Sequence, residues 1–394
     1  MDTVSEKCYR LWAEVDLSAI RTNILNLQSS FTPGTKTCAV IKADGYGHGA
    51  QALAGCLADI VDFYAAATME EAMEIRSAGV STPVLILGYV HPVNGVSAAG
   101  NDIRFTVYDY DTARELSDLC AGAGLKLKVH IKADTGMGRI GFMPDEASAD
   151  TVLAISRLPG LEIEGIFTHF ANADDACPDS ALAQLELFRK FIGYIEDRNV
   201  HIPVKHCANS AASTWIRETD MYMNRLGISI YGLYPSEYVH QTELIPAMTL
   251  KSHVVNVKTV PAGTCVGYGS TWTAAEERVI ATIPVGYADG YMRSLSNKGS
   301  VLINGHRYPI AGRVCMDQIM ADVTGPYEVN KGDEVVLIGS SGDETITMEE
   351  ISELAGSFNY EFACGLGRRI PRLYYENGVL KSIKHDAGIK YDFR

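Results

Sequence analysis

Lys42 lies where a short apolar segment ends and a glycine-rich turn begins. Residues 38–41 (Cys-Ala-Val-Ile) precede it, and Tyr46 and His48 follow it between glycines. Burial disfavours the ammonium form of a lysine and lowers its pKa, and the neutral amine can then hold a carbonyl cofactor as a Schiff base. Alternatively, the aliphatic stem packs while the ammonium group reaches solvent. For a lysine considered alone the second arrangement is the more common, so other residues must decide.

Further polar residues share this position at the end of an apolar segment. The strands of a parallel barrel direct their carboxyl ends to one face, which is where barrel enzymes carry their catalytic groups. Side chains that follow different strands would therefore converge there. Besides Lys42, the residues in such positions are Lys132, His169, Asn209, Ser210, Arg225 and Gly227.

Two of these positions indicate phosphate binding. Asn209-Ser210 and Gly227-Ile228 lie near the seventh and eighth apolar segments, the region where barrels commonly bind phosphate. A helix cap is the simpler interpretation of Asn209 alone. With a strand-end lysine, a phosphate site predicts a phosphorylated carbonyl cofactor, of which pyridoxal 5′-phosphate is the common one. Arg225 would then keep the ring nitrogen unprotonated; a structural salt bridge is the alternative.

The scaffold that these positions require is an α/β fold. Short β-prone segments alternate with segments of helical spacing such as 69–79, and Thr68 and Gly79 are placed to begin and end that helix. Eight alternations predict a parallel (β/α)8 barrel with right-handed crossovers. The predicted strands are 38–42, 63–68, 83–89, 105–108, 127–133, 163–169, 204–210 and 228–233.

The pattern changes after about residue 240, where β-prone segments are joined by turn signals and only 348–355 has a helical pattern, with Thr347 as its cap. We expect a barrel domain over 1–240 and a mainly antiparallel β domain over 241–394. Residues 1–17 contain a segment that could pair with the C-terminal domain. The predicted strands there are 249–259, 278–284, 300–303, 307–310, 316–323 and 334–339.

Composition narrows the function classes. The net charge of −14 over 394 residues, with no basic stripe, argues against a nucleic-acid binder. Nine scattered cysteines without a CxxC pair suit reduced thiols. No secretory h-region or membrane-spanning apolar run is evident, which predicts a cytoplasmic protein without membrane contact. The sequence contains no HxH pair or carboxylate cluster at the predicted strand ends, which argues against a metal-dependent hydrolase.

Several motifs together make the chain resemble the alanine racemase family over essentially its whole length. Residues 40–49 (VIKADGYGHG) and 132–141 (KADTGMGRIG) resemble the family's cofactor-lysine and fifth-strand motifs. Further matches are 168–171 (THFA), 206–212 (HCANSAA), 266–269 (VGYG), 284–290 (PVGYADG) and 312–317 (GRVCMD). The resemblance implies a barrel followed by a β domain, pyridoxal 5′-phosphate as cofactor and a small amino acid as substrate.

The resemblance also implies a two-base mechanism in a homodimer. Lys42 would bind the cofactor's aldehyde and, once freed by the substrate, act as the base on one face of Cα. Tyr268 of the other subunit would act on the opposite face, and its side chain would interact with His169, which in turn interacts with Arg225. The sequence alone allows Tyr268 to be an exposed turn aromatic. A tyrosine with a pKa near ~10 is a weak base at neutral pH, so cationic or hydrogen-bonding neighbours must shift it.

The remaining roles follow from the same motifs. Arg139 and the backbone N–H of Met316 would hold the substrate carboxylate. Lys132 matches a position that is often carbamylated in the family; pairing with Asp134 or Glu162 is the alternative. The cofactor would be held by Lys42, Tyr46, His169, Asn209, Ser210, Arg225, Gly227 and Ile228.

Two departures from the family pattern matter. Leu226 stands where proline is common, which loosens a turn without removing a contact group. Arg368 stands where the family usually has a tyrosine that narrows the substrate pocket. Alanine and serine differ only by a methyl against a hydroxymethyl side chain, and the difference in their binding free energies is small. One pocket residue can therefore change which of the two substrates is preferred. The catalytic domain of a membrane-anchored serine racemase of the vancomycin-resistance type is therefore the alternative to an alanine racemase.

Other functions fit the residues less well. Amino-acid decarboxylases of similar architecture carry a Glu-Pro-Gly-Arg phosphate loop, which this chain lacks. A non-enzymatic cofactor carrier built from the barrel alone would leave 244–394 without a role. We therefore expect a homodimeric, pyridoxal-phosphate-dependent racemase that interconverts L- and D-alanine and supplies D-alanine for peptidoglycan.

Overall fold

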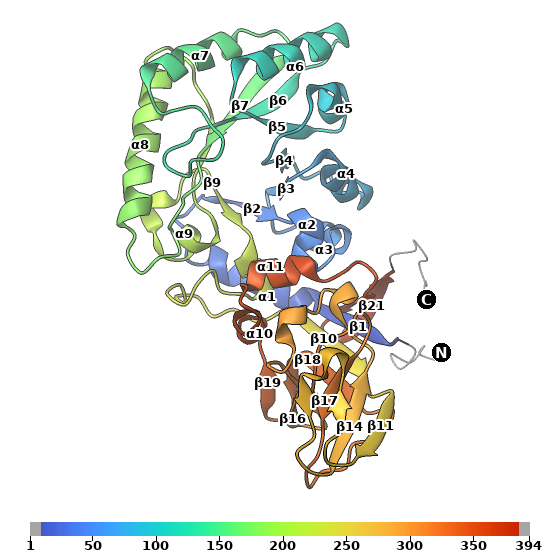
Figure 1. The fold of residues 1–394 in the computed structure, drawn as a ribbon. Coiled ribbons are helices and arrows are strands. Elements are labelled where there is room, and N and C mark those ends of the chain that lie inside the picture. The colour runs from blue at the N-terminus through green and yellow to red at the C-terminus, as the bar shows by residue number, and fades with distance from the viewer. Residues whose placement is uncertain (1–8, 386–394) are drawn as a thin grey trace. The chain divides into compact units, whose positions relative to one another are not determined.

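The computed structural model describes residues 9–385 of the chain, which divide by their contacts into two compact units. The barrel unit comprises residues 19–45 and 50–245. The β unit comprises residues 9–18, 46–49 and 246–385. Each unit is described by itself below, with the element labels of Figure 1.

The barrel unit is built on one eight-stranded parallel sheet in the order β8-β7-β6-β5-β4-β3-β2-β9. Backbone hydrogen bonds from Tyr222 to Lys205 (2.9 Å) and from Arg225 to Ala208 (3.2 Å) connect the two end strands, so the barrel is nearly closed. The strands are β2 (Lys36–Val40), β3 (Phe63–Ala66), β4 (Val84–Ile86), β5 (Ile103–Val107), β6 (Leu127–Lys132), β7 (Leu161–Phe167), β8 (Val204–His206) and β9 (Met223–Leu226). The predicted parallel α/β barrel is confirmed.

Helices connect successive strands, and α6, α7 and α8 lie outside the sheet (Figure 1). Thr68 caps α4 by accepting the N–H of Glu71, and Gly79, at φ 78°, follows the helix end, as predicted. The helices are α1 (Leu17–Gln28), α2 (Lys42–Tyr46), α3 (Ala50–Leu57), α4 (Met69–Ser77), α5 (Gly95–Gly100), α6 (Tyr110–Gly122), α7 (Glu146–Ser156), α8 (Asp179–Glu196) and α9 (Ser210–Trp215).

The predicted eighth barrel strand, 228–233, is wrong. The strand is β9 (Met223–Leu226), and Ile228–Tyr231 forms a 3-10 turn that ends at Gly232 with φ 80°. The apolar alternation of 228–233 reflects burial of this turn. The true strand was hidden because Asn224 and Arg225 are polar, yet both are buried.

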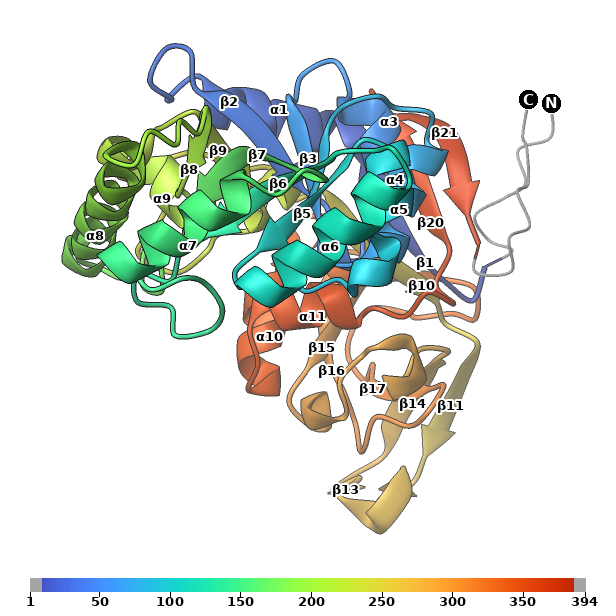
Figure 2. The ribbon, with the colours of Figure 1, turned by 90° about the horizontal axis from the view of Figure 1, so that it is seen from above.

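The β unit contains a larger sheet in the order β16-β15-β18-β10-β1-β20-β21, with β19 paired to β18. β1 (Leu11–Asp16) pairs antiparallel with β10 and parallel with β20, and Figure 2 shows these strands beside one another. The others are β10 (Met248–His253), β15 (Ser300–Ile303), β16 (His306–Pro309), β18 (Glu334–Ser341), β19 (Glu344–Ile346), β20 (Arg372–Glu376) and β21 (Val379–Lys384).

A smaller sheet, β11-β14-β17, and the β12-β13 hairpin complete the unit. Their bounds are β11 (Asn256–Val260), β12 (Cys265–Val266), β13 (Trp272–Thr273), β14 (Arg278–Ile283) and β17 (Ile319–Asp322). The segment 249–259, expected as one strand, is divided between β10 and β11, which lie in different sheets. Thr347 caps α10 (Met348–Ala355) as predicted, whereas a second helix, α11 (Asn359–Gly365), was not predicted.

None of the helices within residues 9–385 is both long and apolar enough to cross a membrane. Each cysteine that the structure describes has a free thiol. In the same residues, no group of three or more His, Cys, Asp or Glu side chains could hold a metal ion.

Candidate active site

Lys42 begins a left-handed turn that follows β2. Ala43, Asp44 and Gly45 have φ of 52°, 52° and 62°, so α2 is left-handed throughout its centre. Each non-glycine residue in this conformation costs about 1–2 kcal/mol, and such strain persists only where neighbouring groups impose it. The sequence predicted a strand through Lys42; the strand instead ends at Val40, and the lysine lies two residues beyond it.

Glu71 and Asp44 impose this turn. The two carboxylate oxygens of Glu71 accept the N–H of Ala43 and the N–H of Ala67, each at 2.7 Å. The Asp44 carboxylate accepts the N–H of Ala50 at 2.9 Å. Glu71 therefore ties the residue after Lys42 to the carboxyl end of β3.

His169, after β7, lies among the cationic residues predicted for the site. Burial lowers its pKa well below the usual value, and the charges of Arg225, Arg139, Lys132 and Lys42 lower the pKa further. Those four residues lie in or just after three strands, Lys42 after β2, Lys132 and Arg139 at the end of β6 and Arg225 in β9, so the barrel brings them within electrostatic range of one imidazole. His169 is consequently neutral at physiological pH.

Arg225 is buried in β9 and is held by neutral acceptors. Its guanidinium donates to the carbonyls of Thr168 and Cys207 at 2.9 Å, and one nitrogen lies 2.9 Å from Nδ1 of His206. His169 Nδ1 lies 3.4 Å away. Burial lowers the pKa of Arg225 to about 10, so the group stays charged at neutral pH. No carboxylate among the described residues forms an ion pair with it.

Lys132 ends β6 inside the barrel and is 2 % exposed. Burial lowers its pKa to about 8; the nearby Asp134 raises it, and Arg225 and Arg139 lower it further. Its amine donates to the Ala133 carbonyl at 2.5 Å. Neither Asp134 nor Glu162, the predicted alternative partners, forms an ion pair with it within the described chain.

Asp134 shapes the loop that carries Arg139. Its carboxylate accepts the N–H groups of Gly136, Gly138 and Arg139 at 2.9–3.1 Å. Burial raises the pKa of Asp134, but these three bonds outweigh that effect and the pKa falls. The exposed Arg139 is therefore presented on a fixed loop above β6.

Ser210 and Gly227 contact each other, although 17 residues separate them. The Ser210 hydroxyl accepts the Gly227 N–H at 2.7 Å, and Asn209 caps α9 by accepting the Ala212 N–H. The Ser210 hydroxyl proton stays available to an oxyanion, because its oxygen is the acceptor in the contact with Gly227. Ile228 is buried beside Gly227.

Three predicted site residues belong to the β unit. Tyr268 is 71 % exposed and lines a cavity of about 460 Å³ with Cys265, Cys315 and Met320. Met316 is exposed, and its carbonyl accepts the Ala288 N–H at 3.0 Å. Tyr46 groups with this unit and contacts the Tyr360 ring at 6.1 Å between centroids.

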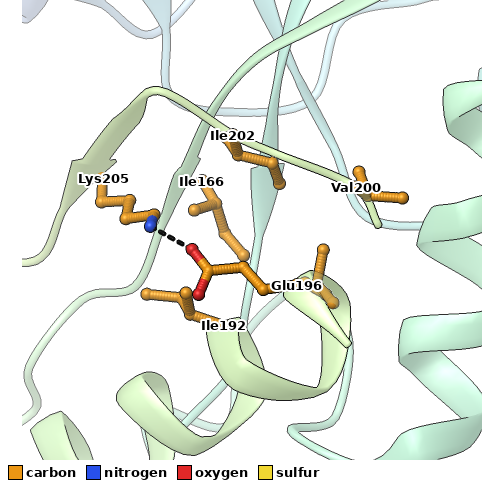
Figure 3. A pocket seen from close by; sticks show the side chains of 7 residues that line it. Ile166, Ile192, Glu196, Val200, Ile202 and Lys205 are labelled. Carbon is orange, nitrogen blue, oxygen red and sulfur yellow. Dashed lines mark hydrogen bonds and ion pairs between the residues drawn. The ribbon is translucent and has the colours of Figure 1, made fainter. Parts of the chain in front are cut away.

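A second pocket has no catalytic character. Figure 3 shows a narrow crevice beside α8, lined by Ile166, Ile192, Val200 and other apolar side chains, with the Lys205–Glu196 ion pair at its edge. It has no room for a water molecule. We assign it to packing.

Two family models match the chain. "Alanine racemase, N-terminal domain" matches residues 15–235, and "Alanine racemase, C-terminal domain" matches residues 247–374. The chain belongs to the alanine racemase family. It is a racemase, an isomerase that acts on amino acids.

Similar proteins of the family match along nearly their full length. The alanine racemase of Methanococcus maripaludis is 43% identical over 367 residues, which cover 92% of this chain and 98% of that protein. The structure of alanine racemase from Clostridium difficile 630 has a TM-score of 0.91 at 37% identity, covering 96% and 98% of the two chains. That of alanine racemase from Bacillus anthracis, with bound L-Ala-P, has a TM-score of 0.91 at 35% identity, covering 97% and 98%.

The similar proteins also bear on the alternative functions, a serine racemase and a cofactor carrier. A histidine racemase from Leuconostoc mesenteroides has a TM-score of 0.85 at 31% identity, covering 93% of this chain and 98% of that one, so the fold also occurs in racemases named for a larger side chain. The curated relatives do not favour the serine racemase alternative. The match to the C-terminal domain model does not favour a carrier built from the barrel alone.

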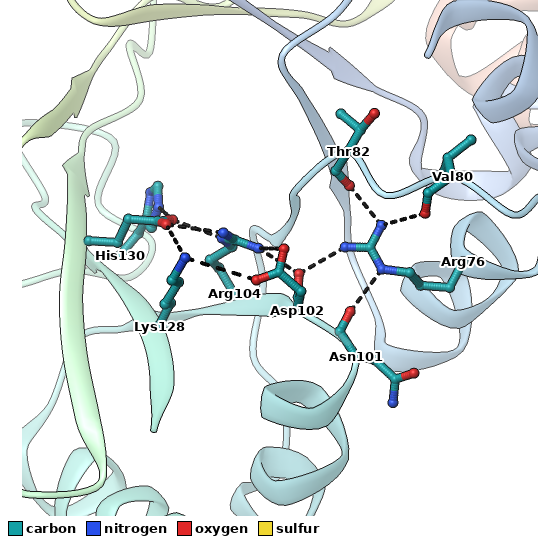
Figure 4. A network of polar contacts seen from close by, with 9 residues as sticks. Arg76, Val80, Thr82, Asn101, Asp102, Arg104, Lys128 and His130 are labelled. Carbon is teal, nitrogen blue, oxygen red and sulfur yellow. Dashed lines mark hydrogen bonds and ion pairs between the residues drawn. The ribbon is translucent and has the colours of Figure 1, made fainter. Parts of the chain in front are cut away.

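The sequence analysis did not assign a role to several polar residues that lie beside the site. His206 was noted only within a motif, and the signal for His130 was its spacing of two from Lys132, which places both on one face of a strand. Glu164, whose carboxylate lies 3.1 Å from His130, gave no such signal, because it lies within a segment that was predicted only as an apolar barrel strand. Figure 4 shows His130, Arg104 and Lys128 meeting in one polar network.

Proposed function

We propose that the chain interconverts L- and D-alanine with pyridoxal 5′-phosphate, using Lys42 and the partner subunit's Tyr268 as its two bases. The supporting observation is the arrangement of Lys42, Lys132, Arg139 and Arg225 around the neutral His169. These side chains come from β2, β6, β9 and the loops that follow them, in a barrel that matches alanine racemases in sequence and in fold.

The residues present fit this cofactor. Ser210 and Gly227 form a compact pair of polar groups at the ends of β8 and β9, suited to the phosphate with Tyr46, Asn209 and Ile228. Arg225 stays charged at neutral pH, so it can donate an N–H hydrogen bond to the ring nitrogen but does not transfer its proton. Pyridoxal 5′-phosphate, when bound, withdraws electrons from the substrate's Cα and makes its proton acidic.

Lys42 would hold the cofactor and then move the Cα proton on one face. Its place at the start of a strained, clamped turn restricts the positions that the amine can reach. Pre-organisation of this kind lowers the barrier to proton transfer, because the base is already oriented.

His169 and Arg225 would prepare Tyr268 of the partner subunit for the opposite face. Because a guanidinium cannot accept, the 3.4 Å approach of Arg225 to Nδ1 of His169 favours the tautomer with its proton on Nε2. That proton is available to the phenolic oxygen of the partner subunit's Tyr268. Inversion at Cα requires bases on both faces.

Arg139 and the Met316 N–H would bind the substrate carboxylate. Lys132, with its pKa lowered to about 8, has a larger neutral fraction than an ordinary lysine, which favours carbamate formation with carbon dioxide. The carbamate anion would orient Arg139 through charge-assisted hydrogen bonds. Loss of the like-charge repulsion between Lys132 and Arg139 would favour the same reaction.

We further propose a cytoplasmic homodimer with composite sites that supplies D-alanine for peptidoglycan. Tyr268 is exposed on the β unit, as a residue that acts in another subunit must be before assembly. The β domain at 241–394 would then complete the barrel site of its partner.

Deuterium exchange at Cα in D₂O tests the activity and the substrate together. L-alanine, L-serine and L-histidine are supplied separately, and both exchange and inversion are followed by NMR. Exchange with inversion that favours alanine supports the proposal. Exchange of serine or histidine at a comparable rate would contradict alanine as the substrate, and cofactor binding without exchange would contradict the activity.

A further inference from the structure

A continuous series of side-chain contacts leads from Arg225 in β9 to the carboxylate of Glu164 in β7. Nδ1 of His206 lies 2.9 Å from a guanidinium nitrogen of Arg225, and its Nε2 lies 2.9 Å from Nδ1 of His130. Nε2 of His130 lies 3.1 Å from the Glu164 carboxylate. His130 and His206 are fully buried, and all four residues belong to the barrel unit.

These contacts allow only one arrangement of protons. A guanidinium nitrogen cannot accept, so Nδ1 of His206 is bare and its proton lies on Nε2. That proton is donated to His130, whose Nδ1 must also be bare. His130 therefore carries its proton on Nε2 and donates it to Glu164, which as a carboxylate can only accept. Every hydrogen bond points from Arg225 toward Glu164, and both imidazoles are neutral.

The surroundings agree with neutral histidines and an ionised carboxylate. Burial lowers the pKa of both His130 and His206. Burial would raise the pKa of Glu164, but hydrogen bonds from His130 and Arg104 hold it well below the usual range. Arg104 reaches the carboxylate at 2.8 Å and 3.1 Å, and Lys128 reaches it at 3.3 Å.

The backbone of β6 and β7 positions the side chains of this hydrogen-bond series. Val129 pairs with Ile163 but His130 pairs with Gly165, so Glu164 is the extra residue of a β-bulge that re-aims its side chain. A Cβ on Gly165 would lie 2.4 Å from Nδ1 of His130, so only glycine leaves room for the ring. The His206 ring stacks on Phe167, with 4.9 Å between centroids and 6° between planes.

We propose that Glu164 is a remote positioning residue, which fixes the protons of His130 and His206 and thereby holds Arg225 as a hydrogen-bond donor to the cofactor's ring nitrogen. Its negative charge polarises the two imidazoles in series, so His206 becomes a stronger acceptor for Arg225. The part of this inference that concerns the cofactor rests on the proposed function. The proton arrangement itself does not.

The proton arrangement is tested by ¹⁵N NMR of histidine-labelled protein at neutral pH, with His130 and His206 assigned by single substitutions. We expect both rings as neutral Nε2–H tautomers. A proton on Nδ1 of either ring, or an imidazolium, would overturn the proposal whether or not the protein is a racemase.

The effect of the charge is tested with two matched variants in β7. Glu164→Gln keeps the volume and one acceptor for His130 but removes the charge, whereas Glu162→Gln makes the same change at an exposed position two residues away. We expect Glu164→Gln alone to move the ¹⁵N shift of Nδ1 in His206, although a whole histidine ring separates the two groups. An unchanged shift, or equal shifts in both variants, would overturn the proposal.

Kinetics and the cofactor's absorbance provide the second readout in the holoenzyme. We expect Glu164→Gln to lower kcat about tenfold, the scale of outer partners of catalytic groups, with little change in KM, and to alter the absorbance of the bound cofactor. A loss confined to KM, or identical spectra and kcat in the Glu164 and Glu162 variants, would contradict the role. If neither variant nor the parent bound the cofactor, the proposed function would fail while the tautomer result stood.

Discussion

The carboxylate of Glu71 accepts the backbone N–H of Ala43, the residue that follows Lys42, at 2.7 Å. Its other oxygen accepts the N–H of Ala67 at the same distance. One side chain thus holds both the strained turn that begins at Lys42 and the end of the neighbouring strand. The position of the Lys42 amine therefore depends on a residue that does not touch the reacting atoms.

Glu71→Gln should misplace Lys42. Glutamine offers one oxygen and one NH₂ group, so one of the two backbone N–H donors would face another donor. We expect a loss of about 1–3 kcal/mol in the free energy of unfolding, measured by urea denaturation, and a lower kcat because small displacements of a catalytic group are costly. Glu70→Gln, exposed in the same helical turn, is the control, and equal effects in both variants would argue against the clamp.

The alternation of strands and helices could be predicted from the sequence because buried parallel strands are continuous apolar segments. The caps of α4 and α10 followed from Thr68 and Thr347. The eighth strand could not be found this way, because burial of Asn224 and Arg225 inside a barrel depends on partners from other strands.

The site was predictable only in part. Lys132, His169 and Arg225 fall at strand ends, and the structure brings them within electrostatic range; their roles stay predictions. The bulge at Glu164 depends on contacts across strands that no local pattern reveals, and the clamp on the left-handed turn after Lys42 likewise comes from a residue of another segment. Glycines at 45, 47 and 49 were the available signal for the turn, since all three have positive φ.

Lys42→Ala should abolish exchange of the Cα proton from both enantiomers of alanine. The variant removes the group that we propose holds the cofactor and acts as the base on one face. Its absorbance should show loss of covalent cofactor attachment, while thermal unfolding should stay near that of the parent because the side chain is only partly buried. Residual racemisation at the parental rate would contradict the assignment.

Tyr268→Phe should slow removal of the proton from L-alanine far more than from D-alanine, because only one of the two proposed bases is lost. The two exchange rates in D₂O measure this asymmetry. Equal losses would contradict the two-base assignment.

Mixing Tyr268→Phe with Lys42→Ala subunits should restore some activity, since each mixed dimer would keep one intact site, and no recovery would count against shared sites.

Arg368→Tyr should increase the preference for alanine over larger substrates. Arg368 is exposed in the β unit, at the position where the resemblance places a tyrosine that narrows the pocket. Pocket changes of this size are worth about 1–3 kcal/mol in discrimination, so the ratio of kcat/KM for alanine to that for serine should rise by about tenfold or more. Arg369→Tyr is the neighbouring control, although it also breaks the bonds of Arg369 to Asp289 and Asp317. An unchanged ratio in Arg368→Tyr would exclude this residue from substrate choice.

Lys132 should make stability depend on pH in the alkaline range. Burial lowers its pKa from 10.5 to about 8 in the folded chain. Below pH 8 the amine is charged in both states and the folded state bears the full desolvation cost. Between pH 8 and 10.5 the unfolded state binds more protons, so the free energy of unfolding rises with pH.

Comparison with Lys132→Met isolates this contribution, because methionine fills a similar volume without a charge. The difference in the free energy of unfolding between parent and variant should rise by up to about 3 kcal/mol across that range and stay flat below it. Urea denaturation in carbon dioxide-free buffer measures the difference. Bicarbonate should abolish the rise if the amine becomes a carbamate, since the carbamate nitrogen does not titrate there, and a flat difference in both buffers would contradict the buried amine.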